Sequence, residues 1–157
     1  MAMGELLYEG KAKKIFSTGN PDQVVQYFKD DATAFNAQKR GTILEKGVIN
    51  NKVSERLFQL LEQNGIRTHF VERSNDREML TKKVRIVPIE VVVRNVVAGS
   101  LAKRLGLKEG NRIDPAVVEF YYKNDGLGDP LVNDDHLRLM NVATPGILRE
   151  LREFGHA

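Results

Sequence analysis

The residues best suited to chemistry in this sequence are two lysines beside a glycine, in Gly10-Lys11-Ala12-Lys13. Glycine lets a backbone approach a phosphate closely, and lysines at i and i+2 on a strand point to the same face. Two ammonium groups that converge beside a small turn suit a polyphosphate. The alternative is an ordinary exposed lysine pair in a hairpin. For this tetrapeptide alone the alternative is favoured, because short motifs often match by chance.

A second anion site is indicated where Arg94 follows three valines and Gly99-Ser100 comes shortly after. A guanidinium that is taken out of water must pair or bind an anion. Ser100 is a good N-cap for a short helix over residues 101–105, whose first N–H groups could hold a phosphate together with Arg94. The alternative, in which Arg94 pairs with Glu90 and Ser100 only caps the helix, fits the pattern equally well.

A third candidate is the turn over residues 123–130, which carries Lys123, Asp125 and Asp129. Carboxylates on a loop beside a phosphate site could bind Mg²⁺ or an amine, although a solvated Asp/Gly turn is the commoner outcome. His69 and His136 have no partner at metal-ligand spacing. We therefore expect structural or surface roles for both histidines, and we assign no metal ligand.

The elements that must position these residues indicate an α+β fold. Residues 5–31 predict three antiparallel strands, because their connections are too short for crossovers. Residues 46–64 have apolar positions at helical spacing and predict one covering helix, which ends at a left-handed Gly65. Two further strands are expected over residues 68–72 and 79–83, the second being the weaker.

The second half of the chain is predicted to mix strands and helices. Val84 to Val93 is the most β-rich stretch, with Pro88 at a sheet edge or a lobe boundary. A strand over residues 117–122 and a helix over residues 147–154, behind an N-cap at Thr144, complete the pattern. The chain is thus divided into a small antiparallel lobe, residues 1–83, and the start of a second α+β lobe, residues 84–157.

Composition excludes several classes of protein. The 157 residues are 41% hydrophobic and 29% charged with a net charge of +3, so the chain can build a core and is not disordered. The absence of cysteine excludes disulfides, thiolate zinc sites and a cysteine nucleophile. Charges are evenly spread and tryptophan is absent, which argues against nucleic acid as a partner. No apolar run could span a membrane and the start is not laid out as a signal peptide, so we expect a cytoplasmic protein.

Three further motifs in the sequence are Tyr8–Lys13, Asp31–Asn36 and Val87–Leu101. Taken together, they closely resemble the phosphoribosylaminoimidazole-succinocarboxamide synthase (SAICAR synthetase) family of purine biosynthesis. The resemblance implies an ATP- and Mg²⁺-dependent ligase that joins L-aspartate to the carboxylate of carboxyaminoimidazole ribonucleotide through an acyl phosphate, releasing ADP and phosphate. It also implies that the small lobe binds ATP and is related to the N-terminal lobes of protein kinases and ATP-grasp enzymes.

The resemblance assigns roles to particular residues of this chain. Gly10, Lys11, Ala12 and Lys13 would hold the ATP phosphates, and Lys82 with residues 84–89 would line the adenine pocket where the lobes join. Arg94 and Ser100 would bind the phosphate of the nucleotide substrate. Lys123 and Asp129 would lie near the substrates as the catalytic pair.

Family members continue beyond the matched region, with an Asp-x-Lys-x-Glu-Phe-Gly strand and a later acidic loop that do not occur here. The resemblance is thus to an N-terminal portion, and we expect no measurable ligase activity from these 157 residues alone. We also expect uncovered apolar surface around Val117, Phe120 and Ile147, which would favour a homo-oligomer. The alternative function is a noncatalytic nucleotide-binding or regulatory module.

Overall fold

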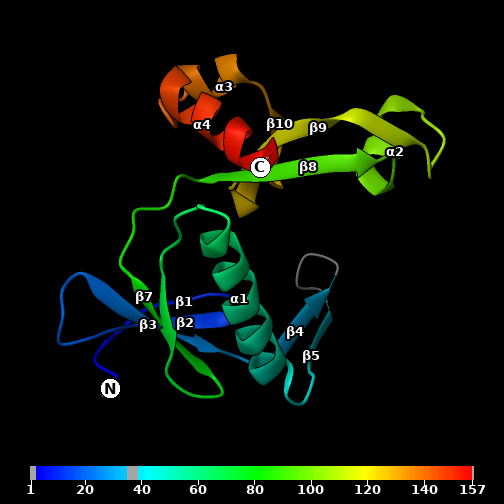
Figure 1. The fold of residues 1–157 in the computed structure, drawn as a ribbon. Helices are drawn as coiled ribbons and strands as arrows, with labels where there is room; N and C mark the ends of the chain where they lie inside the picture. Colours follow the sequence, from blue (N-terminus) through cyan, green and yellow to red (C-terminus); the bar gives the residue numbers. More distant parts are fainter. Residues whose placement is uncertain (1–2, 35–38, 157) are drawn as a thin grey trace. The chain divides into compact units, whose positions relative to one another are not determined.

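The first part of the chain folds around a five-stranded antiparallel sheet (Figure 1). The structure is a computed structural model that describes residues 3–34 and 39–156. Phe35 and Asn36 of the second motif lie outside the described residues. The chain divides into two compact units, Met1–Arg85 and Ile86–Ala157.

The sheet of the first unit has the strand order β1-β2-β3-β7-β6. Its strands are β1 (Leu6–Glu9), β2 (Lys13–Ser17), β3 (Gln23–Phe28), β6 (Phe70–Arg73) and β7 (Glu78–Lys82). Neighbouring strands are antiparallel throughout. The three strands predicted over residues 5–31 are confirmed.

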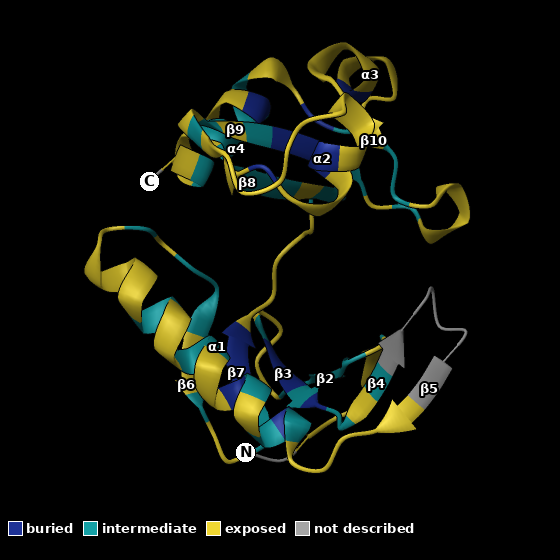
Figure 2. Cartoon of the chain, turned by 90° about the vertical axis from the view of Figure 1, so that its right-hand side faces the viewer, coloured by how far each residue is buried: buried dark blue, intermediate teal, exposed yellow. Residues whose placement is uncertain are grey.

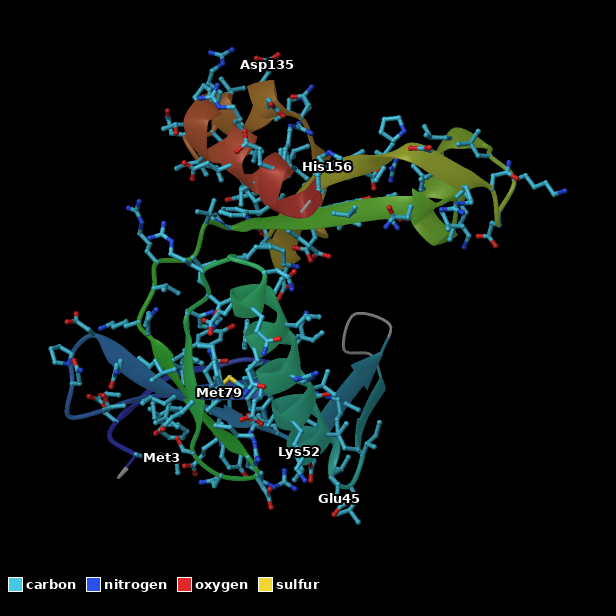
Figure 3. All side chains as sticks on the ribbon, in the orientation of Figure 1. Met3, Glu45, Lys52, Met79, Asp135 and His156 are labelled. Carbon is cyan, nitrogen blue, oxygen red and sulfur yellow. The ribbon has the colours of Figure 1, made fainter. Side chains whose placement is uncertain are left out.

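The core of the first unit lies on β3 and β7, which are dark blue in Figure 2. Val25, Phe28, Met79 and Leu80 are all exposed by 2% or less, and Met79 lies in the interior of the unit (Figure 3). The expectation that the strand over residues 79–83 is weak was wrong. This strand lies between β3 and β6 in the sheet. Its successive residues Met79, Leu80 and Thr81 are all buried, so both of its faces are covered.

Helix α1 (Lys46–Gln63) packs against β3 and β6. It ends as predicted, because Gly65 has a φ of 81° and the Ile66 N–H donates to the Leu61 carbonyl at 3.0 Å. The apolar positions that predicted this helix, however, are largely exposed. Those positions are 38–57% exposed, and most of α1 is yellow or teal in Figure 2. The buried residues of α1 are Gly47 and Asn51. The exposed apolar positions are Ile49, Val53, Leu57, Leu60 and Leu61.

The buried contacts of α1 come from a small and a polar residue, and Phe58 adds an aromatic contact, because its ring stacks on that of Phe70 in β6 with 5.8 Å between centroids. A Cβ at Gly47 would lie 2.4 Å from the Phe28 carbonyl oxygen, so only glycine fits there. The Asn51 side chain donates to the Asn75 and Glu78 carbonyls at 2.9 and 3.3 Å. A hairpin that the sequence did not predict, β4 (Asp31–Ala34) and β5 (Lys39–Thr42), forms a separate two-stranded sheet between β3 and α1 in the chain.

The second unit is built on a three-stranded antiparallel sheet in the order β10-β9-β8. Its strands are β8 (Ile89–Val96), β9 (Arg112–Tyr122) and β10 (Leu131–Val132). Its helices are α2 (Gly99–Leu105), α3 (Asp134–Leu139) and α4 (Pro145–His156), with the 3-10 turn η1 (Asp125–Leu127). Residues 83–88 form no strand, which corrects the expectation of a strand that begins at Val84. Pro88 lacks an N–H for a ladder, and β8 begins directly after it.

The two faces of this sheet differ in chemistry. Val91, Val118 and Phe120 lie on one face, where α4 packs and where Leu137 and Leu148 complete a core. The expectation that Phe120 and Ile147 are uncovered was wrong, because Phe120 is 1% exposed and Ile147 packs against that core. Val117 points to the other face and is 41% exposed.

Strand alternation gives that other face a polar character. It carries charged and hydroxyl side chains from neighbouring strands, namely Glu90, Arg94, Glu119 and Tyr121. Among the described residues, no helix combines the length and the apolar character that a bilayer span requires.

Candidate functional site

The turn between β1 and β2 carries the first candidate motif. The Gly10 N–H donates to the Lys13 carbonyl at 2.9 Å, and the Lys29 N–H donates to the Ala12 carbonyl at 2.9 Å. A Cβ at Gly10 would lie 3.1 Å from the Tyr8 ring, so the turn leaves little room for a side chain there. Strand β2 begins at Lys13, and Lys11 lies in the turn, so the i, i+2 strand geometry does not extend to Lys11.

Lys13 is held inside the first unit. Its Nζ donates to Gln26 Oε1 at 3.2 Å and lies 4.8 Å from the centroid of the Phe28 ring. The side chain is half-buried, and this burial lowers the pKa of Lys13. A half-buried ammonium at the end of a tight turn is well placed to meet an anion that approaches the turn.

Gln26 and His69 complete this cluster. His69 makes the kind of structural contacts that the sequence predicts for it, whereas sequence reasoning missed Gln26. Gln26 Nε2 lies 3.2 Å from Thr81 Oγ1 and 3.0 Å from His69 Nε2. The His69 ring meets the Phe58 ring edge-on at 5.0 Å between centroids. Burial lowers the pKa of His69, and the positive charges of Lys13 and Lys82 lower it further.

Lys82 lies at the end of β7, and its side chain contacts the segment before β6 and not the Gln26 amide. Its Nζ donates to the Thr68 carbonyl at 3.4 Å. Lys82 also lines a cavity of about 240 Å³, together with Glu62, Gly65, Ile66, Arg67 and Thr68. Lys82 is far from the Gly10–Lys13 turn in the sequence. It lies beside His69, because the Lys82 N–H donates to the His69 carbonyl at 2.7 Å.

In the second unit, Arg94 and Ser100 come together. Arg94 Nη2 donates to Ser100 Oγ at 3.1 Å and to the Tyr121 hydroxyl at 3.3 Å. Arg94 Nε donates to Glu119 Oε2 at 3.0 Å, so its carboxylate partner is Glu119 and not Glu90. The prediction of Ser100 as an N-cap was wrong, because Ala98 is the N-cap of α2 and Ser100 lies inside the first turn.

Glu119 is the centre of this polar group, and sequence reasoning missed it. Its side chain is 8% exposed and accepts from Arg94, from Arg104 and from the Tyr121 hydroxyl. Arg104 Nη1 also donates to the Tyr121 hydroxyl at 3.2 Å. The hydrogen bond to Tyr121, followed by that to Glu119, raises the pKa of Arg94 and keeps its guanidinium charged. We call Arg94, Ser100, Arg104, Glu119 and Tyr121 the Glu119 cluster.

Lys123 and Asp129 also come together. Lys123 Nζ lies 2.6 Å from Asp129 Oδ2 and 3.5 Å from Glu90 Oε2. These carboxylates, Asp129 first, raise the pKa of Lys123. The other Asp129 oxygen accepts from the Asn124 N–H at 2.8 Å, which fixes the turn.

The structure also tests the roles of the remaining candidates. The structural role expected for His136 is confirmed, because its ring Nδ1 accepts from the Asn133 N–H at 3.3 Å in a capping box at the start of α3. Within residues 3–34 and 39–156, no three His, Asp or Glu side chains gather in a way that could hold a metal ion.

Comparison with known proteins agrees with the motifs and the fold. The profile of the SAICAR synthetase family matches residues 6–157. The chain belongs to this family. A phosphoribosylaminoimidazole-succinocarboxamide synthase of Clostridium botulinum (strain Okra / Type B1) is 57% identical to it over 151 residues, which are 96% of this chain and 64% of that protein.

Solved SAICAR synthetases share the fold of this chain. The structure from Ehrlichia chaffeensis is 47% identical with a TM-score of 0.89, over 94% of this chain and 62% of that one. A SAICAR synthetase solved in complex with ADP is 43% identical with a TM-score of 0.86, over 94% of this chain and 64% of that one. The chain therefore spans a little less than two thirds of the length of these SAICAR synthetases. The predicted mixture of antiparallel sheets and few helices is confirmed.

Proposed function

We propose that this chain carries the ATP-binding part and a large share of the nucleotide-substrate site of an ATP-dependent ligase. The ligase joins L-aspartate to the carboxylate of carboxyaminoimidazole ribonucleotide in purine biosynthesis. The observation that carries the proposal is the relative solved in complex with ADP, which is 43% identical over 94% of this chain. The half-buried Lys13 beside the Gly10 turn supports it.

The proposed reaction proceeds in two steps. A carboxylate oxygen of the ribonucleotide attacks the γ-phosphorus of ATP, the bond to the β,γ-bridging oxygen breaks, and ADP leaves. The aspartate amine then attacks the carbon of the acyl phosphate, phosphate leaves, and the amine loses a proton as the amide forms. The protein contributes positioning and charge neutralisation, so no nucleophilic side chain is required.

In this proposal the first unit is the ATP-binding lobe that the sequence predicts over residues 1–83, of the kind found in protein kinases and ATP-grasp enzymes. Lys11 and Lys13 neutralise the ATP phosphates, while the backbone of Gly10 and Ala12 lets the phosphates approach the turn. Lys82 contributes from the cavity beside α1, on the side of the adenine.

The second unit, predicted as residues 84–157, binds the ribonucleotide. Arg94 Nη2 and Ser100 Oγ are 3.1 Å apart, so one phosphate group can contact both of them. Lys123 and Asp129, which form an ion pair at 2.6 Å, lie near the reacting groups in this proposal. Lys123 keeps its positive charge there, because its carboxylate neighbours raise its pKa.

The family also implies Mg²⁺, and the described residues do not fit a complete site for it. No three carboxylate or histidine side chains converge in the described ranges, and Asp129 is engaged with Lys123 and the Asn124 N–H. Mg²⁺ prefers near-octahedral oxygen ligation. The use of Mg²⁺ and a cytoplasmic location stay predictions from the sequence.

Ligand titrations monitored by NMR test the proposal, because they detect weak binding and locate it. ATP is expected to perturb residues around Lys13, and the ribonucleotide is expected to perturb residues around Arg94. Lys13→Met should weaken only ATP, and Arg94→Gln should weaken only the ribonucleotide. If each substitution instead weakened the other ligand, the assignment of the two sites would be reversed.

An assay of ADP release separates the ligase from the alternative function. A ligase releases ADP only when both aspartate and the ribonucleotide are present. A noncatalytic module binds ATP without any release that depends on these two substrates.

A further inference from the structure

The amide of Gln26 can adopt only one orientation in its surroundings. Gln26 is 7% exposed, and its two amide ends face three polar atoms on β2, on β7 and beside β6. An ammonium group can donate but cannot accept a hydrogen bond. The atom 3.2 Å from Lys13 Nζ must therefore be the amide oxygen, and the NH₂ end must face Thr81 and His69.

This orientation fixes the protonation of His69. Because the NH₂ group of Gln26 donates, the His69 Nε2 that lies 3.0 Å away must accept. A ring nitrogen that accepts carries no proton, so His69 is neutral and its proton is on Nδ1. The charged groups that act on His69 are Lys13 from β2 and Lys82 from β7, both positive, and the neighbour from α1 is the uncharged Phe58 ring. Nothing among these neighbours favours a charged imidazole.

We propose that Gln26 is a positioning residue for nucleotide binding, which holds the Lys13 ammonium in place and couples it to the protonation state of His69. The phosphate contact of Lys13 rests on the proposed function, whereas the coupling between Lys13 and His69 does not. A second proton on His69 would place an N–H against the NH₂ group of Gln26. The amide would then have to turn, and its NH₂ end would face Lys13, which would lose its acceptor.

The consequence is a pH-dependent affinity for ATP. Above the pKa of His69 the amide holds Lys13, and affinity is at its full value. As pH falls through that pKa, which lies below the ordinary histidine value, Lys13 is released and affinity declines. Protonation of ATP itself also lowers affinity at acid pH, so the measured quantity is the difference between the wild type and a Gln26 variant.

The first test is the tautomer of His69 in the intact chain, read from long-range proton–nitrogen NMR spectra of ¹⁵N-labelled protein. His69 is expected to be neutral with its proton on Nδ1. His136 gives an internal reference, because its Nδ1 accepts from Asn133 and its proton must therefore be on Nε2. A His69 that carries its proton on Nε2, or that is charged at neutral pH, would overturn the inference.

The second test compares Gln26→Met with Gln26→Glu. Methionine removes both contacts, so ATP affinity should fall about three- to tenfold and should lose its dependence on His69. Glutamate accepts from both neighbours, so it should keep Lys13 in place and raise the pKa of His69. Gln23→Met makes the same substitution at the start of the same strand and controls for the loss of a glutamine from β3. A Gln26→Met variant with the wild-type pH profile for ATP would contradict the proposal.

The third test is the tautomer of His69 in Lys13→Met. This measurement needs neither a Gln26 variant nor ATP. Without the ammonium, the Gln26 amide can turn, and both neutral tautomers of His69 should become populated. An unchanged single tautomer would overturn the coupling. Absence of ATP binding by the wild type would instead overturn the proposed function, and with it the phosphate role of Lys13.

Discussion

The guanidinium of Arg94 donates from Nε to Oε2 of the buried Glu119 at 3.0 Å, across the pair of strands β8 and β9. This contact uses only one edge of the guanidinium. Nη2 is turned toward Ser100 and Tyr121, on the side where α2 begins. Glu119 therefore orients Arg94 and does not use up its capacity to bind an anion.

Glu119→Gln should weaken ribonucleotide binding about tenfold, because a neutral amide holds Arg94 and Arg104 less firmly than a carboxylate does. ATP affinity should not change, since the Glu119 cluster belongs entirely to the second unit. Titration of both ligands by calorimetry or NMR measures these affinities. Glu150→Gln on the exposed part of α4 is the matched control. An equal loss of affinity for ATP would show that the cluster acts on the stability of the whole chain.

Arg94→Leu should weaken ribonucleotide binding more than Glu119→Gln does. A charge-assisted contact to phosphate contributes about 1.5–3 kcal/mol, so ribonucleotide affinity should fall roughly ten- to a hundredfold. The variant should still fold, because Arg104 remains as a partner for the buried Glu119 carboxylate. Thermal unfolding checks this. If ATP affinity fell and ribonucleotide affinity did not, Arg94 would not be a phosphate ligand of the ribonucleotide.

The regular parts of the fold could be predicted from the sequence, because their signal is a local period. The apolar spacing over residues 46–64 predicts α1 within one residue of its observed end at Gln63. The hairpin of β4 and β5 was missed because Lys39-Arg40-Gly41-Thr42 has no apolar alternation. The burial of β7 was missed because it depends on the position of β7 between β3 and β6, which is a property of the sheet and not of its residues.

The contact between two candidate residues that lie close together in the sequence could be predicted, but contacts with distant residues could not. Arg94 and Ser100 are six positions apart and were paired correctly, whereas Glu119 is 25 positions from Arg94. The register of β8 on β9 decides which carboxylate reaches the guanidinium, and register is not visible in a single strand. One signal was available, because Glu119 is a charged residue inside the apolar run 117–122.

A third prediction concerns acid stability. Arg77 donates to both Asp30 oxygens at 2.8 and 2.9 Å, and the Gly47 N–H donates to Oδ1 at 2.8 Å. The hydrogen bond from Arg77, followed by that from Gly47, lowers the pKa of Asp30 from 3.8 to about 2. The folded state therefore binds this proton less readily than the unfolded state. The stability that the carboxylate contributes is present above about pH 4 and is lost as pH falls to about 2.

Asp30→Asn should therefore lower the melting temperature at neutral pH, and the difference from the wild type should vanish near pH 2. Thermal unfolding followed by circular dichroism between neutral pH and pH 2 measures this convergence. Asp22→Asn, at the exposed turn before β3, is the control. Its melting temperature should change with pH in the same way as that of the wild type. A constant difference at every pH would mean that the contribution of Asp30 does not depend on its charge.

The last prediction concerns the exposed apolar positions of α1. Leu57 is 54% exposed, whereas Leu80 on β7 is 2% exposed in the same unit. Leu80→Ala leaves a cavity and should lower the free energy of unfolding by about 2–5 kcal/mol. Leu57→Ala should cost less than about 1 kcal/mol, because little area returns to water and alanine favours the helix. Denaturant unfolding of the two variants at low protein concentration measures both values. If Leu57→Ala cost as much as Leu80→Ala, these positions would be buried in solution, and a midpoint that rises with protein concentration would identify a second copy of the chain as the covering surface.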